Sequence, residues 1–180
     1  MASHYLLVDG YNVIYANAAL AAAAEHSLET ARIKLCDTLC EFKALSRYRI
    51  IVVFDAHLVP GGVGCDMDYH NIKVVFTKEA ETADHYIERA AYILSKNSRK
   101  RDHITVATSD VLEQLIILGQ GAGRISGEDL WKEIESLKKA MRAKYIENRP
   151  IKKNPIESLL DEETARKLEH MRYGNITPNA

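Results

Sequence analysis

The chain has 180 residues, of which 47% are apolar and 27% are charged. This is the composition of an ordinary globular domain, so it excludes a wholly disordered or collagen-like chain, and the length favours one folded domain. The 24 basic and 25 acidic residues give a formal net charge of −1, which excludes a uniformly basic nucleic-acid-binding surface.

Four short, continuously apolar runs predict strands that are buried on both faces of a sheet. These runs are residues 5–8, 50–54, 72–76 and 103–107, and a short fifth strand is expected near Arg124-Ile125. Residues 57–70 contain one proline and three glycines, so we expect them to form a loop.

Segments that favour helix alternate with these runs. They are residues 11–24, a segment that Ser27 caps, 82–96, 111–118 and 126–145. In the last segment Asp129 follows Ser126 by three residues, the spacing of a capping box. The alternation predicts an α/β domain over residues 1–145, with a central, mostly parallel sheet of four to five strands flanked by helices. Residues 146–180 are expected to form a linker and a short C-terminal helix.

Cysteine content and hydropathy indicate the cellular compartment of the protein. Three cysteines are too few for a disulfide framework, which favours a reducing compartment. No Lys or Arg precedes the first apolar run, so we expect no signal peptide. No run approaches the roughly 20 apolar residues of a membrane helix. We therefore expect a soluble cytoplasmic protein with no membrane partner.

Acidic side chains follow three of the predicted strands. Asp9 and Asp55 come directly after their strands, and Asp110 follows the 103–107 strand closely. Because the carboxyl ends of parallel strands share one edge of a sheet, we expect these side chains to converge there. Glu81 and Asp84 are three residues apart at the start of the 82–96 helix, so they are expected to share a helix face.

Carboxylates held close together repel one another, which raises their pKa values unless something compensates. The simplest compensation is a hard divalent cation, since Mg²⁺ takes oxygen ligands, keeps several waters and often bridges carboxylates to phosphate. Such a site suits phosphodiester hydrolysis, in which the metal activates water and stabilises the displaced oxygens. Taken alone, each aspartate is better explained as a turn former or a helix cap, and this explanation weakens for the set.

Three other polar side chains stand beside these acids. Asn12 could orient Asp9, contact a phosphate or cap the helix that follows. Thr108 and Ser109 could donate hydrogen bonds to a phosphate or cap a helix. All three are candidate substrate-binding residues.

Five short motifs occur in the order and spacing of one known family. They are Val8-Asp-Gly-Tyr-Asn12, Val53-Phe-Asp-Ala-His-Leu-Val59, Phe76-Thr-Lys-Glu-Ala-Glu-Thr-Ala-Asp84, Ala107-Thr-Ser-Asp110 and Gly119-Gln-Gly-Ala122. Between about residues 5 and 145 the chain resembles the YacP-like branch of the NYN domains, in the PIN-like nuclease superfamily. The characterised type of this branch is a bacterial ribosome-associated endoribonuclease.

The resemblance implies a PIN-like, three-layer fold with an acidic metal site at the carboxyl edge of the sheet. It implies a metal-dependent endoribonuclease that cleaves mRNA on the translating ribosome, with Mg²⁺ or Mn²⁺ as the cofactor. Asp9 and Asp84 match the carboxylates on which the family's activity rests most directly. Asp55 and Asp110 match further catalytic positions. Asp9, Asp84, Asp110 and Glu81 are the candidate metal ligands.

Basic residues gather near the end of the predicted domain. Residues 1–128 carry 13 basic and 16 acidic residues, whereas residues 132–153 carry eight basic and three acidic ones. Lys138, Lys139 and Arg142 are candidate contacts to RNA or the ribosome, through counterion release at the phosphate backbone. A solvated helix face would explain the same charges.

Some patterns in the chain point to other functions. Gly119-Gln-Gly-Ala-Gly-Arg124 lacks the third glycine of a dinucleotide-binding fingerprint, so we expect no nucleotide cofactor. Tyr11 could stack on a base or pack in the core. An RNA- or ribosome-binding module without turnover, and a toxin-like PIN ribonuclease, remain alternatives to the ribosome-dependent enzyme.

Overall fold

The structure, a computed structural model, describes residues 3–55, 64–78, 81–97, 103–109, 122–147 and 163–164. The chain divides into two units, residues 1–142 and 143–180, and the sheet belongs to the first. The predicted linker and C-terminal helix fall almost wholly outside the described ranges, in which Glu163 and Thr164 are helical. Within these ranges no helix is both long enough and apolar enough to cross a membrane.

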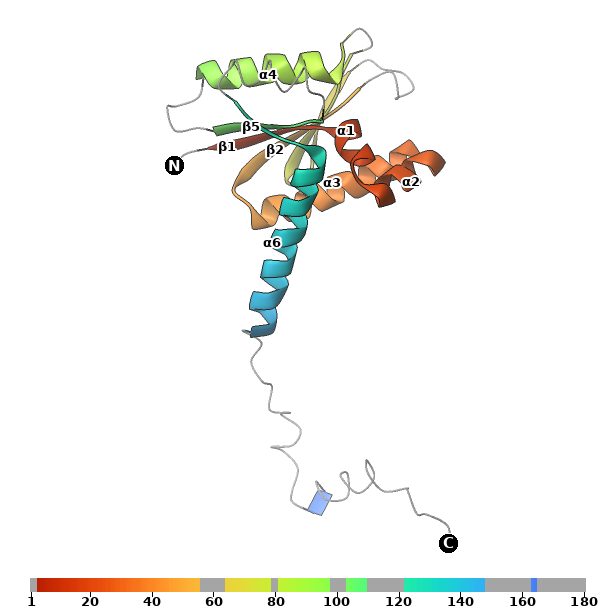
Figure 1. The fold of residues 1–180 in the computed structure, drawn as a ribbon, viewed down its shortest axis with the longest axis vertical. Helices are drawn as coiled ribbons and strands as arrows, with labels where there is room; N and C mark the ends of the chain where they lie inside the picture. The colour runs from red at the N-terminus through yellow and green to blue at the C-terminus, as the bar shows by residue number, and fades with distance from the viewer. Residues whose placement is uncertain are drawn as a thin grey trace. The chain divides into compact units, whose positions relative to one another are not determined.

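A six-stranded sheet forms the centre of the fold (Figure 1). Its strands are β1 (His4–Asp9), β2 (Tyr48–Phe54), β3 (Cys65–Tyr69), β4 (Ile72–Phe76), β5 (His103–Ala107) and β6 (Gly123–Ile125). They lie in the order β3-β4-β2-β1-β5-β6, and every neighbouring pair is parallel except β3 with β4. The predicted α/β fold with a mostly parallel sheet is therefore confirmed.

Strand β3 lies in the stretch that the sequence analysis assigned to a loop, and that assignment is wrong for residues 65–69. The strand pairs antiparallel with β4 across a tight turn at His70 and Asn71, where His70 adopts a left-handed φ of 50°. Residues 65–68 are all exposed, so no apolar pattern marks them as a strand. Backbone pairing and an ion pair from Lys73 to Asp66 at 3.2 Å hold β3 in place, and the sheet has six strands rather than four to five.

Five helices surround the sheet in the described ranges. They are α1 (Gly10–Tyr15), α2 (Ala18–His26), α3 (Leu28–Leu45), α4 (Ala83–Asn97) and α6 (Gly127–Glu147). The helix predicted over residues 11–24 is in fact two helices, because Asn17 leaves the helical conformation and its side chain caps the backbone N–H groups of Ala19 and Leu20. Ser27 caps α3 as predicted. The helix predicted over residues 111–118 lies outside the described residues.

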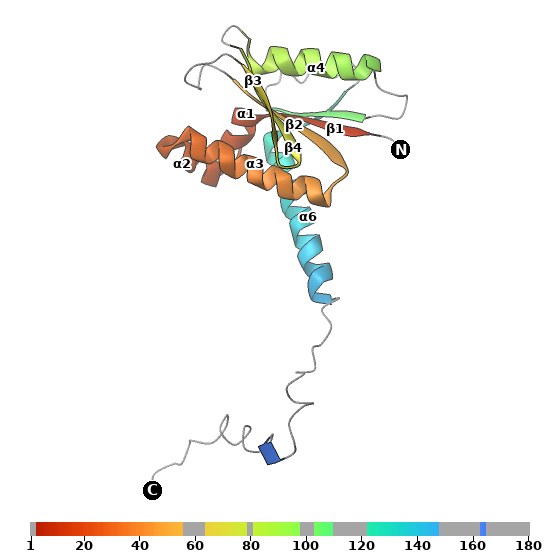
Figure 2. The same cartoon turned by 180° about the vertical axis from the view of Figure 1, so that it is seen from behind.

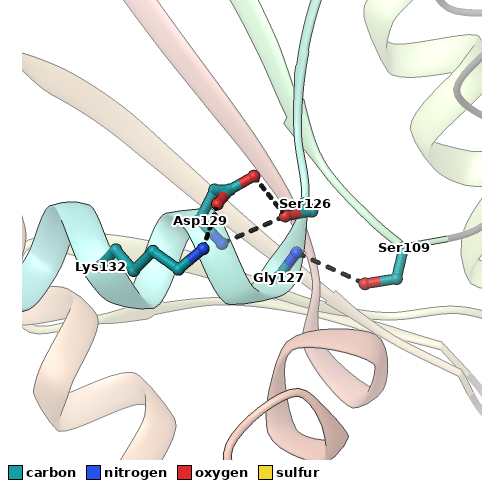
Figure 3. Close-up of polar contacts among 5 residues, drawn as sticks. All are labelled: Ser109, Ser126, Gly127, Asp129 and Lys132. Atoms are coloured by element: carbon teal, nitrogen blue, oxygen red, sulfur yellow. Dashed lines mark hydrogen bonds and ion pairs between the residues drawn. The ribbon is translucent and has the colours of Figure 1, made fainter.

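Ser126 caps the start of α6 as predicted, and the Asp129 side chain bonds back to Ser126 through its hydroxyl (Figure 3). The backbone N–H of Asp129 donates to Ser126 Oγ at 3.1 Å, and that hydroxyl donates to Asp129 Oδ2 at 2.8 Å. Lys132 Nζ also lies 2.8 Å from Asp129 Oδ1. These bonds fix where the helix begins.

Helices cover both faces of the sheet, α4 on one and α1 to α3 on the other (Figures 1 and 2). Along β1, Leu6 and Val8 belong to one buried cluster and Leu7 to the other, as the alternation of side chains in a strand requires. Burying each such side chain contributes about 1.5–3 kcal/mol. The predicted three-layer arrangement is confirmed, and it places the ends of β1 and β2 at one solvent-facing edge.

Candidate active site

A surface pocket lies at the carboxyl edge of the sheet. It is lined by Asp9, Tyr11, Asn12, Tyr15, Asp55, Ala83 and Asp84. Asp9 is the last residue of β1, Asp55 follows the last residue of β2, and Asp84 lies in the first turn of α4. Three of the predicted acidic residues, each from a different part of the chain, therefore meet in one pocket.

Asp9 is the buried member of this group, with only 7% of its surface exposed. Its Oδ1 accepts a hydrogen bond from the backbone N–H of Asn12 at 3.0 Å, and its Oδ2 accepts one from Asn12 Nδ2 at 3.3 Å. Burial raises the pKa of the Asp9 carboxyl, and the charge of Asp84 raises it further, while the bonds from Asn12 lower it. Asp9 is thus a carboxylate that nearby positive charge would stabilise in its ionised form.

Asn12 connects Asp9 to the end of β5. Its Nδ2 lies 3.5 Å from Thr108 Oγ1, and its Oδ1 accepts a hydrogen bond from the backbone N–H of Ser109 at 3.2 Å. Of the roles proposed for Asn12, orienting Asp9 is observed, whereas the cap of α1 is Asp9 itself. Asn12 lines the pocket, whereas Thr108 is fully buried. The side-chain amide therefore fixes the Asp9 carboxylate relative to the neighbouring strand.

Ser109 extends this network to α6. Its Oγ accepts a hydrogen bond from the backbone N–H of Gly127 at 3.4 Å (Figure 3). A Cβ atom at position 127 would lie 2.7 Å from the Cβ of Ala16, so glycine permits the close approach of α6 to α1. Ser109 therefore links Asn12 of α1 to Gly127 of α6, and these bonds support the pocket from the segment after β5.

Tyr11 packs beneath the pocket. Its ring is 8% exposed and meets the Phe54 ring edge to face, with centroids 5.3 Å apart. Its hydroxyl accepts a hydrogen bond from Arg32 Nη1 at 2.9 Å, and burial raises its pKa. A Cβ atom at Gly10 would overlap the Phe54 ring, which explains the glycine between Asp9 and Tyr11. Of the two alternatives for Tyr11, the structure shows packing.

Glu81 occupies a different pocket from Asp84. It precedes α4 instead of lying on it, lines a pocket with Lys78 and Tyr86, and forms an ion pair with Arg89. The expectation that Glu81 and Asp84 share a helix face is therefore wrong, because the helix begins two residues after Glu81. Asp110 lies outside the described residues.

Tyr15 is a pocket residue that the sequence analysis did not single out. It ends α1, four residues after Tyr11, and its side chain is 59% exposed. The spacing of four places both tyrosines on one side of the helix, which is the signal that could have identified it.

Comparison with known proteins identifies the family. The family model for the YacP-like NYN domain matches residues 6–173. The chain belongs to the YacP-like NYN domain family. One relative in this family, the uncharacterized protein YacP of Bacillus subtilis strain 168, is 39% identical over 174 residues, which cover 95% of this chain and 98% of the relative.

Solved structures of this family have the same fold. The crystal structure of Rae1 (YacP) from B. subtilis is 39% identical, covers 94% of this chain and 95% of its own, and superposes with a TM-score of 0.68. A mutant of the same protein is 34% identical, covers 95% and 99%, and superposes with a TM-score of 0.67. The flanked, mostly parallel sheet described above is thus the fold of the YacP-like NYN domain.

The donor set of this NYN pocket fits a magnesium-type cation. Within the described ranges, no group of three or more acidic, histidine or cysteine side chains could hold a metal ion alone. Mg²⁺, however, is usually bound by one or two carboxylates, with waters and substrate phosphates as its other ligands. Asp9 and Asp84 provide such a pair, since they share the pocket and their charges interact.

The three candidate RNA-contacting cations of α6 are not equivalent. Lys138 is largely covered, with 21% of its side chain exposed, and its Nζ lies 2.9 Å from Glu41 Oε2 on α3. Lys139 and Arg142 instead line a shallow surface pocket together with Lys132. We call Lys132, Lys139 and Arg142 the α6 basic face: all three are exposed, Glu135 lines the same pocket, and Lys132 is the one that also pairs with Asp129.

Proposed function

We propose that this protein is a metal-dependent endoribonuclease that cleaves RNA phosphodiester bonds, with mRNA on the translating ribosome as its substrate. The observation that supports it most is the pocket in which Asp9, Asp55 and Asp84 meet at the edge of the sheet. Membership of the NYN family, with its PIN-like fold, implies a nuclease. The products would carry 5′-phosphate and 3′-hydroxyl ends.

Asp9 and Asp84 would hold Mg²⁺ or Mn²⁺, with Asp110 as a further candidate ligand. When bound, such a cation supplies activation of water and stabilisation of the charge on the phosphate. Asn12 holds both oxygens of Asp9 in a fixed orientation. Asp84 lies in the first turn of α4, a position at which acidic side chains are favoured because the N-terminus of a helix carries partial positive charge. Asp55 adds a third carboxylate on the β2 side of the pocket.

The α6 basic face would bind RNA or the ribosome through contacts to phosphates. We propose that the protein acts in the cytoplasm and needs no nucleotide cofactor. Each phosphate contact that a basic residue makes adds about one unit to the slope of log affinity against log salt. Lys139→Ala and Arg142→Ala should each reduce this slope, whereas Lys138→Ala, which breaks the pair with Glu41, is the matched control and should not.

The decisive experiment is end-mapping of cleaved RNA. Labelled RNA, free and on translating ribosomes, is incubated with the wild type and Asp84→Asn, with Mg²⁺, with Mn²⁺ or with chelator. Asp68→Asn, an exposed carboxylate on β3, is the matched control. We expect cleavage by the wild type and Asp68→Asn that chelation or Asp84→Asn abolishes. Cleavage that survives either treatment contradicts the assigned site, and binding without any cleavage would favour a binding module.

A further inference from the structure

Tyr15 is an exposed aromatic side chain that lines the same pocket as three carboxylates. Its ring is 59% exposed, although Val13 and Ile14, beside it on α1, are fully buried. A single exposed apolar side chain needs no special explanation on a protein surface. Tyr15 differs from such a residue because it shares its pocket with Asp9, Asp55 and Asp84.

The geometry of α1 makes Tyr15 available and leaves Tyr11 unavailable. The ring of Tyr11 is held against Phe54 and its hydroxyl is held by Arg32. Tyr15 lies one helical turn further on the same side and also lines the pocket. Within the described residues, no aromatic ring packs on Tyr15. Its ring can therefore receive a flat apolar group from a ligand in the pocket.

The chemistry of the pocket calls for such a contact. Three carboxylates repel a phosphodiester, so binding of a nucleic acid here gains from interactions that do not depend on charge. Stacking of a base on an aromatic ring is such an interaction, and its loss weakens binding by roughly 5- to 150-fold per base. Bases in a duplex are already stacked, so the contact selects an unpaired nucleotide.

We infer that Tyr15 is a stacking platform for one unpaired nucleobase beside the phosphate that is cleaved at the proposed metal site of Asp9 and Asp84. This inference rests on the proposed endoribonuclease function and deepens it, because it names the substrate as single-stranded at the point of cleavage. The base would lie on the ring of Tyr15, and its neighbouring phosphate would face the carboxylates. Any of the four bases would serve, since each has an aromatic face.

The test measures binding and stacking separately from cleavage. Full-length protein with Asp84→Asn is titrated with a short single-stranded RNA that carries 2-aminopurine next to the mapped cleavage position. The same titration is made with an RNA that lacks that one base. Both are repeated with Tyr15→Ala, with Tyr15→Phe and with Tyr92→Ala, which removes an exposed tyrosine of α4 outside the pocket. Melting temperatures check that all variants are folded.

Four results are expected together. Tyr15→Ala weakens binding of the intact RNA at least about 5-fold, whereas Tyr15→Phe and Tyr92→Ala stay within about twofold of the parent. The 2-aminopurine fluorescence falls on binding to the parent and not on binding to Tyr15→Ala. Removing the base weakens binding to the parent but not to Tyr15→Ala. Kinetics are measured on whichever substrate the wild type cleaves, free RNA or RNA on ribosomes. On that substrate, Tyr15→Ala raises KM more than it lowers kcat.

Other outcomes overturn the inference and identify what failed. If the wild type cleaves RNA but Tyr15→Ala behaves like Tyr92→Ala, the stacking role is wrong and the proposed function stands. If Tyr15→Phe loses as much affinity as Tyr15→Ala, the hydroxyl is the contact instead of the ring. If the wild type neither binds nor cleaves RNA in either form, the proposed function fails and the stacking role fails with it.

Discussion

Asp9 and Asp129 stand at the starts of two helices, yet their pKa values are shifted in opposite directions. Asp9 caps α1 from a buried position, and burial raises its pKa. Asp129 lies in the first turn of α6 in full contact with solvent, and hydrogen bonds from Lys132 and Ser126 lower its pKa. An aspartate at a helix start can therefore have its pKa shifted either way. The direction depends on whether a positive charge, such as that of Lys132, already lies beside the carboxylate. Only Asp9 is left to gain from an added cation.

The largest expected effect is on catalysis and separates the two aspartates. Asp9→Asn should lower cleavage by more than about 100-fold, since it removes a proposed metal ligand, and loss of a residue that only supports a metal ligand costs about 10–100-fold. Asparagine caps helices as well as aspartate, so the free energy of unfolding should stay close to that of the wild type. Asp129→Asn should cleave like the wild type. End-point assays measure cleavage, and urea unfolding measures the free energy of unfolding. An equal loss of cleavage in Asp9→Asn and Asp129→Asn would contradict the proposed difference between the two aspartates.

The next effect concerns two asparagines near helix starts. Asn12→Ala removes the bond to Asp9 Oδ2 and the acceptor of the Ser109 N–H, so it should lower the free energy of unfolding by about 1–3 kcal/mol and cleavage by about 10–100-fold. Asn17→Ala removes only the cap of α2 and should cost about 1 kcal/mol without changing cleavage. Metal titrations of cleavage, read beside Mn²⁺ binding, should show weaker metal affinity for Asn12→Ala alone.

A smaller effect is the dependence of stability on pH, which should have opposite signs at the two aspartates. The pKa of Asp9 is raised, so the folded state binds its proton more tightly than the unfolded chain does, and the free energy of unfolding falls as pH rises from 3.8 through the folded pKa. The pKa of Asp129 is lowered, so its stabilisation is present above 3.8 and is lost as pH falls below that value.

Urea midpoints measured from pH 3 to 7 in chelator test this contrast. The difference between wild type and Asp9→Asn should change only above pH 3.8, and that between wild type and Asp129→Asn only below it. The same sign for both variants would show that burial does not distinguish the two sites.

The smallest effect is local to α6. Ser126→Ala removes the hydroxyl that bonds Asp129, and should lower the free energy of unfolding by about 1 kcal/mol with cleavage unchanged. Ser136→Ala, at an exposed position of the same helix, is the control for helix propensity. A loss of cleavage in Ser126→Ala at unchanged stability would mean that the start of α6 belongs to the site.

Much of the fold follows from local patterns in the sequence. Leu6 to Val8 and Val52 to Phe54 are buried on both faces, and that burial is what a continuous apolar run predicts. Ser27 and Ser126 mark helix starts because the caps are made by short-range bonds. Strand β3 could not be predicted in this way, since its exposed residues 65–68 show no apolar pattern and are held by backbone pairing with β4, the next strand along the chain.

The site was predictable to the extent that topology alone brings its residues together. Asp9 and Asp55 meet because β1 and β2 are parallel neighbours. The prediction for Glu81 was wrong because α4 begins at Ala83, so Glu81 precedes the helix and lines another pocket. Tyr15 was not predicted as a site residue because its exposure depends on where α1 ends. Asn17 sets that end, but the alanine-rich run that follows predicts one continuous helix.

The two borders of the sheet have a consequence for how the protein behaves in a crowded solution. A bare outer strand offers unpaired N–H and C=O groups to any other chain, and short or charged outer strands discourage such pairing. Strand β3 carries Asp66 and Asp68 along its exposed length, and β6 at the opposite border is three residues long. Each border thus protects the sheet against growth from one molecule to the next, so the fold resists aggregation through strand addition.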